Sequence, residues 1–197
     1  GLLFPRLLPH LHPGYPLVAD RRFCSCSAAV ALAARGVDIV MRNHQSRRSD
    51  FRTGLRPGCR DHLVIWEKPA RPAWMGAAEY AALPGEIVLR ETLSEAARKG
   101  FRTRRIIAVS SFQHPAEKSA AESGSYYARR WRVELYFDDI KTTMRMDVLR
   151  TESPAMVCRE LLMHMIAYNL VRSTIARSGA DPGRASFKGT ADRIATW

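Results

Sequence analysis

Apolar and polar positions alternate between two regimes in the first 41 residues. An apolar run at 15–19 (YPLVA) ends at Asp20, an alanine-rich stretch fills 25–35, and a second apolar run occupies 37–41. Short apolar runs of this kind are typical of buried strands, and the alanine-rich stretch is typical of a helix that ends at Gly36. Strand, helix and strand in so few residues favour a pair of parallel strands. The pattern therefore predicts an α/β fold.

The next seventy residues have a different character. Residues 42–62 form an arginine-rich segment that contains Gly54, Pro57 and Gly58, and it predicts a basic loop or hairpin. Three later segments have the composition and alternation of strands, and they lie at 63–68, 86–93 and 104–110. We therefore interpret residues 42–112 as a β-rich insertion.

Helical signals dominate from residue 115 to residue 146. Apolar side chains recur there at helical spacing, which predicts a core-facing stripe of Val133, Phe137, Ile140 and Met144. A second helix is expected to begin after Ser153, which is a suitable N-cap before Pro154, and to end near Ser178, before Gly179.

Four parts follow from these patterns. Residues 1–41 form the strand–helix–strand core, 42–112 the insertion, 113–179 the C-terminal helices, and 180–197 a tail with weak signals.

One helical face carries an unusual set of polar side chains. Tyr127, Arg130, Glu134 and Lys141 follow the spacing Y-x2-R-x3-E-x6-K, and at about 100° per residue they fall within an arc of roughly 60°. A carboxylate, two cations and a phenol on one face could hold a metal ion beside a phosphate. The alternative is that Glu134 is a solvated residue or forms an ordinary i,i+4 ion pair with Arg130.

Asp20 is the second candidate acid. It ends an apolar strand, and the carboxyl ends of parallel strands are where α/β folds place their sites. The alternative role is capping of the following helix. If Asp20 and Glu134 met in space, two carboxylates could bind a pair of metal ions that promote in-line displacement at a phosphodiester.

Charge and cysteine content narrow the class of partner. Lys and Arg number 31 against 19 Asp and Glu, which gives a net charge of +12. This excess favours nucleic acid or an anionic membrane surface, although a basic surface that only confers solubility is the alternative. No apolar run is long enough to span a membrane. The four cysteines are scattered, the spacing of Cys24 and Cys26 is too short for a zinc knuckle, and we expect reduced thiols.

Residues 127–141 resemble the signature of bacterial insertion-sequence transposases of the DDE type, in the subgroup named for its Tyr-Arg-Glu-Lys motif. Further segments are similar to that group, and they are LVADRRF (17–23), RPAWMGAAEYAALPGEIVLRE (71–91), ELLMHMIAYNLVR (160–172) and SFKGT (186–190). The resemblance therefore covers nearly the whole chain.

The resemblance implies a partial RNase H-like domain with a β-rich insertion between its second and third catalytic acids. Asp20 would be the second acid and Glu134 the third, and both would be ligands of Mg²⁺, with Mn²⁺ as a substitute. Tyr127, Arg130 and Lys141 would contact DNA phosphates. The reaction would be hydrolysis at the element end, followed by attack of the freed 3′-OH on target DNA.

The resemblance also implies partners and a location. Double-stranded DNA would be bound at the element ends and at the target by a homodimer, in the bacterial cytoplasm at the nucleoid and without a membrane.

One departure from the family pattern affects activity. The first catalytic Asp of the family lies on a strand upstream of the second, and none of the 19 residues before Asp20 is acidic. We therefore expect a chain that is truncated at its N-terminus and does not transpose by itself. Two other functions stay open, namely a non-catalytic DNA-binding remnant and an RNase H-like nuclease with another substrate.

Overall fold

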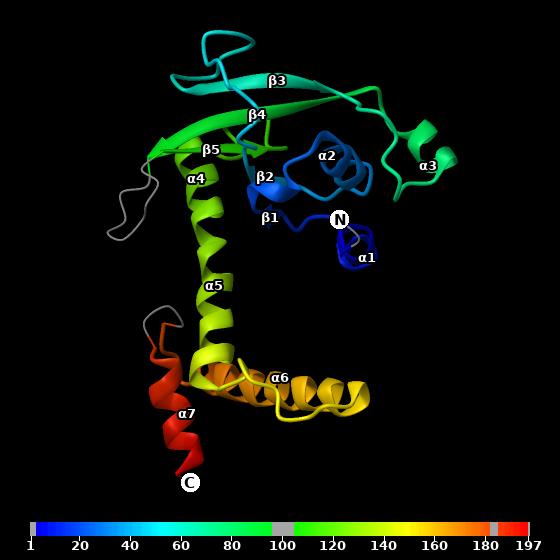
Figure 1. Cartoon of the computed structure of the whole chain (residues 1–197). Coiled ribbons are helices and arrows are strands. Elements are labelled where there is room, and N and C mark those ends of the chain that lie inside the picture. Colours follow the sequence, from blue (N-terminus) through cyan, green and yellow to red (C-terminus); the bar gives the residue numbers. More distant parts are fainter. Residues whose placement is uncertain (1–2, 96–104, 182–184, 197) are drawn as a thin grey trace. The chain divides into compact units, whose positions relative to one another are not determined.

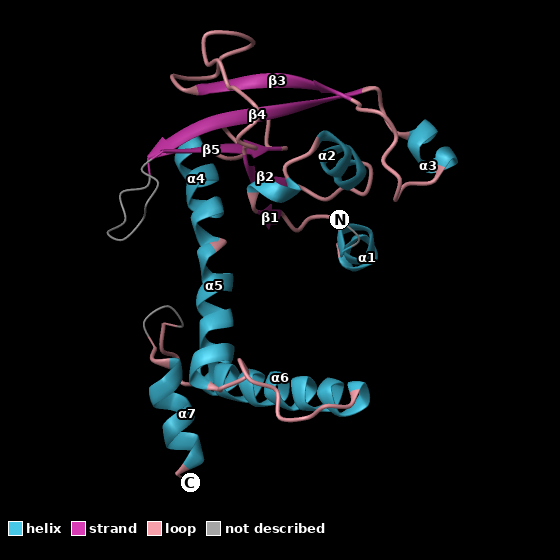
Figure 2. Cartoon of the chain, in the orientation of Figure 1, coloured by secondary structure: helices cyan, strands magenta, loops and turns pink. Residues whose placement is uncertain are grey.

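The computed structural model describes residues 3–95, 105–181 and 185–196 (Figure 1). The chain divides into two compact units, Gly1–Arg130 and Trp131–Trp197. The first unit contains the sheet and the second unit is helical (Figure 2).

The sheet of the first unit has five strands in the order β1-β2-β5-β4-β3. The strands are β1 (Leu17–Ala19), β2 (Ile39–Arg42), β3 (Asp61–Glu67), β4 (Glu86–Glu95) and β5 (Arg105–Ser110). Strands β1 and β2 are parallel, and all the other neighbours are antiparallel. Strands are found at all five positions that the sequence predicts; Arg104, the expected start of the last strand, lies outside the described residues.

The strand–helix–strand prediction is confirmed. Helix α2 (Cys26–Ala33) connects the parallel strands β1 and β2. The Ser25 side chain accepts a hydrogen bond from the Ala28 N–H and caps the helix at its start. Gly36 has a φ of +67°, a conformation that glycine adopts without steric cost after a helix.

Strands from the expected insertion continue the same sheet. Strand β5 pairs with β2 through Val40 and Ser110, and β4 and β3 follow it. This is possible because β2 uses only one edge to pair with β1. The boundary at residues 41 and 42 therefore does not separate two sheets, and the assignment of 42–112 to an insertion stays a prediction.

Helices cover both faces of this sheet. On one face α2 packs into the main apolar core, whose fully buried members include Leu32, Met41 and Leu89. On the other face lies α4 (Ala120–Arg129), where Tyr127 packs against Val40 and Ile106. Because successive side chains of a strand point to opposite faces, Val40 and Met41 belong to different apolar clusters.

The first unit also contains short helical turns that the sequence did not predict. They are α1 (Leu3–Leu7), η1 (Leu8–His10), η2 (Arg21–Phe23) and α3 (Ala77–Ala82). Such short pieces carry too few positions to define a helical period.

The second unit consists of helices α5 (Trp131–Asp138), α6 (Pro154–Arg177) and α7 (Phe187–Ala195), with a π-helical turn η3 (Asp139–Thr143) after α5. The predicted ends of α6 are confirmed, since the Ser153 side chain accepts a hydrogen bond from the Met156 N–H and Gly179 has a φ of +73°. Among the described residues, no helix has the length and apolarity needed to cross a lipid bilayer.

Arg172 organises the core of the second unit. Its guanidinium lies 4.6 Å from the Tyr136 ring centre, 5.4 Å from that of Tyr168 and 5.0 Å from that of Phe187. It also forms an ion pair with Asp139. Cation–π contacts with three rings and a charge partner join α5, η3, α6 and α7.

The predicted apolar stripe of the first long helix is only partly correct. Ile140 is buried and Met144 packs against the same cluster, whereas Val133 and Phe137 are 48% and 56% exposed. The reason is that α6 and α7 pack against the η3 end of this segment, where the cluster of the second unit lies. The prediction of a core position is therefore wrong for Val133 and Phe137.

Candidate functional site

Asp20 lies at the carboxyl edge of the two parallel strands. Ala19 pairs with Met41, so that the next residues along the two strands, Asp20 and Arg42, follow at the same edge. This is the edge at which open α/β sheets place their ligands. The sequence prediction for the position of Asp20 relative to its strand is thus confirmed.

Tyr127 joins Asp20 across a separation of more than a hundred residues. Its hydroxyl donates a hydrogen bond of 3.2 Å to Asp20 Oδ1. The ring is 5% exposed, and it packs against Val40 and Ile106 on the α4 face of the sheet. Packing on the sheet therefore directs the phenol of α4 towards the end of β1.

Cationic groups determine the charge state of Asp20. Burial raises the pKa of its carboxyl, but the Arg21 backbone N–H, the charge of Arg130, the Tyr127 hydroxyl and the charge of Arg21 act in the opposite direction. Their combined effect holds the pKa below its ordinary value, and Asp20 is a carboxylate at neutral pH.

The pKa of the Tyr127 phenol moves the other way. Burial raises it, the positive charges of Arg130 and Arg42 lower it, and the negative charge of Asp20 raises it again, with a net increase. The phenol is therefore a hydrogen-bond donor at neutral pH. Arg42 was not among the predicted site residues, because only the pairing of β1 with β2 places it near this phenol.

Replacing Tyr127 by Phe is expected to raise the pKa of Asp20. The hydroxyl favours the charged carboxylate and so lowers the pKa. Without it, less opposes the increase in pKa that burial causes. Because the folded-state pKa is depressed, Asp20 stabilises the fold above its unfolded pKa, and this contribution is lost as pH falls through the folded value. NMR titration of the Asp20 carboxyl carbon measures the shift. Tyr126→Phe, in the adjacent position, is the control and is expected to leave that pKa unchanged.

Glu134 and Lys141 lie in the second unit. Glu134 is half-buried on α5, and Lys141 is exposed in η3. The candidate carboxylates Asp20 and Glu134 thus belong to different units. That they lie close together stays a prediction. Tyr127 and Arg130, in contrast, belong to the same unit as Asp20 and influence it directly.

The π-helical turn changes the geometry expected for Lys141. Residues 139–143 form wider i→i+5 hydrogen bonds, so the rotation of 100° per residue applies only as far as Asp138. Short π-helical turns occur frequently at functional sites. Their presence after Glu134 was not predicted from the sequence.

A buried ion pair and a buried hydrogen-bonded pair on β3 and β4 were also missed. Arg90 binds both carboxylate oxygens of Asp61, and the His62 Nε2 lies 3.1 Å from Glu91 Oε2. All four residues are at most 5% exposed. They are positioned by the register of β3 against β4, for which an isolated sequence contains no signal.

The described residues contain no metal cluster, and the four cysteines form no disulfide. Among the described residues, no three His, Cys, Asp or Glu side chains gather closely enough to form a metal cluster. All four cysteines are free thiols, and burial raises the pKa of Cys24 to about 11. The chain therefore has no reactive thiol at Cys24 at neutral pH.

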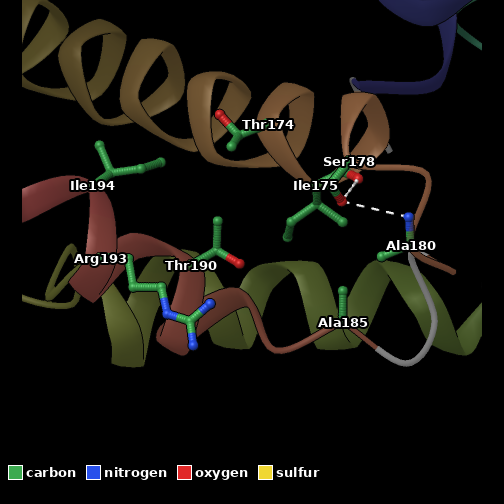
Figure 3. A pocket seen from close by; sticks show the side chains of 8 residues that line it. All are labelled: Thr174, Ile175, Ser178, Ala180, Ala185, Thr190, Arg193 and Ile194. Atoms are coloured by element: carbon green, nitrogen blue, oxygen red, sulfur yellow. Dashed lines mark hydrogen bonds between the residues drawn. The ribbon is translucent and has the colours of Figure 1, made fainter.

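Helices α6 and α7 enclose a pocket of about 540 Å³ in the second unit (Figure 3). Ile175 and Ile194 line it together with Thr174, Thr190 and Arg193. None of the described residues that line this pocket is acidic.

Comparison with known proteins identifies the family of this chain. Residues 3–170 match the family model described as a transposase DDE domain. Over 136 residues the chain is 34% identical to the transposase InsG for insertion sequence element IS4 of Escherichia coli (strain K12). That match covers 64% of this chain and 28% of the relative, so the chain spans under a third of that protein. The mixed α/β sheet with its helices is consistent with a partial RNase H-like domain. The chain belongs to the family of DDE-domain transposases.

Proposed function

We propose that this chain forms part of a catalytic domain that cleaves and rejoins DNA at the ends of an insertion sequence. The observation that carries the proposal is the hydrogen bond from Tyr127 to Asp20, with the charge of Arg130 beside it. Two residues of the Tyr-Arg-Glu-Lys spacing thus lie at the carboxylate that ends β1. A structural helix cap at Asp20 would not need either of them.

Asp20 and Glu134 would act as ligands of a divalent metal ion. A carboxylate that is ionised at neutral pH is a suitable hard ligand for Mg²⁺ or Mn²⁺, and the depressed pKa of Asp20 fits this requirement. A bound metal pair supplies activation of the attacking oxygen and stabilisation of the leaving oxygen in phosphodiester chemistry. Glu134 lies four residues beyond Arg130, one helical turn further along the sequence.

Tyr127, Arg130 and Lys141 would position the DNA backbone, and we add Arg42 to this set. The fork of an arginine suits phosphate oxygens, and the protonated phenol of Tyr127 is a neutral donor. The partner would be double-stranded DNA at the element ends and the target. A homodimer assembled on DNA in the cytoplasm, at the nucleoid, would complete the active form.

Iron-directed backbone cleavage tests whether the two carboxylates share a metal ion. Iron(II) replaces Mg²⁺, and with ascorbate and peroxide it generates hydroxyl radicals that cut the polypeptide next to the bound ion. We expect fragments that end near both Asp20 and Glu134, identified by mass spectrometry. Excess Mg²⁺ is expected to suppress both cuts, because it competes for the same oxygen ligands.

Substitutions separate this result from unspecific damage. Asp20→Asn and Glu134→Gln should each remove both cuts, since each deletes one ligand of a shared ion. Asp138→Asn, one turn further along α5, serves as the matched control and should retain them. Cuts near only one of the two acids would contradict the shared site and would favour a DNA-binding protein without catalysis.

A further inference from the structure

Helix α4 lies unusually close to the sheet at one glycine. Ser123 is fully buried on the helix, and Gly124 follows it opposite Ser94 of β4. A β-carbon at position 124 would lie 2.7 Å from Ser94 Oγ and 2.8 Å from Ser94 Cβ. Contacts this short do not occur between ordinary carbon atoms, whose optimal separation is about 3.5–4.0 Å.

The Ser94 side chain cannot remove this conflict by rotating. Rotation about χ1 moves Oγ away from the helix, but Cβ is fixed to the backbone of β4. At Ser94 that strand pairs with Ile106 of β5, and just before it the Leu93 N–H donates a hydrogen bond to the Arg60 carbonyl, so the backbone does not give way easily. Any side chain at position 124 therefore requires α4 to move away from the sheet.

The start of α4 is anchored more firmly than its end. Ser119 and Glu122 form a capping box, in which each side chain bonds the backbone of the other. Just before the helix, the Lys118 carbonyl accepts a hydrogen bond from Arg90, which is itself held by Asp61. Displacement at position 124 would therefore tilt the later part of the helix, which carries Tyr127.

We propose that Gly124 is a positioning residue of the site, because its missing side chain allows α4 to approach β4 closely enough for the Tyr127 hydroxyl to reach Asp20. The relevance of Gly124 to catalysis rests on the proposed function. The contact itself is independent of that function. Tyr127 lies three residues beyond Gly124, on the same side of the helix, so a small displacement at the glycine is passed directly to the phenol.

Nitration of tyrosine by tetranitromethane measures the position of Tyr127 in the intact chain. Tyr127 is 5% exposed and should react slowly, whereas Tyr15 is 75% exposed and is an internal reference. Overpacking at this contact opens the helix–sheet interface, so in Gly124→Ala we expect the nitration rate of Tyr127 to rise on the order of tenfold. Peptide mass spectrometry gives the rate at each tyrosine separately, and that of Tyr15 should stay unchanged.

Substitutions at Ser94 identify the responsible contact. In Gly124→Ala combined with Ser94→Gly, the glycine is transferred from helix to strand, both short contacts disappear, and slow nitration of Tyr127 should return. Combination with Ser94→Ala removes only the hydroxyl and retains Cβ, so it should rescue little. Ser125→Ala, at an exposed position of the same helix, is the matched control and should behave as the parent chain.

Two outcomes would overturn the inference. One is a Gly124→Ala chain in which Tyr127 reacts as slowly as in the parent. The other is a rescue by Ser94→Ala that equals the rescue by Ser94→Gly. If Gly124→Ala does not fold, Ser94→Thr enlarges the same contact from the strand, and an unchanged Tyr127 rate there would refute the inference.

Activity is not needed for this readout. Failure of the shared metal site would leave the nitration result intact, and the two proposals can therefore fail separately.

Discussion

Replacing Arg90 by Ala is expected to lower the free energy of unfolding of the first unit by about 3–5 kcal/mol, because the change leaves a buried carboxylate without its partner. Arg90 is fully buried, its Nε donates to Asp61 Oδ1 at 2.7 Å, and its Nη2 donates to Asp61 Oδ2. Asp61 is 5% exposed, so solvent cannot replace the guanidinium. Urea unfolding followed by circular dichroism measures the loss, which is large beside the ~5–15 kcal/mol of a typical domain.

A surface pair of the same chemistry provides the control. Arg105 lies 3.9 Å from Glu95, and both side chains are largely exposed, so Arg105→Ala should change stability by less than about 1 kcal/mol. Removing both charges, with Arg90→Met and Asp61→Leu together, should recover much of the loss, because no buried charge is then unpaired. Equal losses in Arg90→Ala and Arg105→Ala would contradict this account of the pair.

Local patterns predicted the five strands and α2 of the first unit because each of these elements carries its own signal. The apolar runs that end at Asp20 and at Met41 became the parallel strands β1 and β2, and the alanine-rich stretch became α2. Alternation predicted β3, β4 and β5. Gly36 marked the end of a helix because its positive φ is unfavourable for other residues.

Pairing between distant strands could not be predicted from the same signals. The buried pairs of Asp61 with Arg90 and of His62 with Glu91 depend on the register of β3 against β4. Shifting that register by one residue would turn every side chain to the other face. In the sequence alone, these four residues resemble exposed polar residues. Only the pairing of β3 with β4 brings them together.

In the second unit, too, local features could be predicted and packing between distant segments could not. Ser153 and Gly179 identified both ends of α6 because capping is local. Helix α7 was missed for two reasons. Gly189 interrupts its helical pattern, and its Phe187 packs against Tyr168 of α6, which is distant in the sequence. The exposure of Val133 and Phe137 likewise depends on which surfaces the other helices cover.

The candidate site was predicted in part. Asp20 was identified from its place at a strand end, and Tyr127 and Arg130 from the helical face that they share with Glu134 and Lys141. The structure brings these three residues together. Arg42 was counted only among the arginines of a basic segment, because its proximity to Tyr127 follows from the pairing of β1 with β2.

Arg130 and Lys141 together are expected to make a large contribution to DNA binding by this chain. If each contacts a phosphate, Arg130→Gln and Lys141→Gln should each weaken binding to a duplex about tenfold at low salt, since a charge-assisted hydrogen bond is lost. Each substitution should also reduce the slope of log affinity against log salt concentration by about one. Fluorescence anisotropy with a labelled duplex, repeated over a range of salt concentrations, gives both quantities.

Arg132 separates contact from net charge. It is exposed on α5, about 200° around the helix from Glu134, so Arg132→Gln removes the same charge from a different face. The overall field of a chain with net charge +12 would then change equally in all three single variants. We expect Arg132→Gln to retain most of the affinity and nearly the full salt slope. If all three variants lost affinity equally, general electrostatic attraction would account for binding, and the Tyr-Arg-Glu-Lys face would have no special role in it.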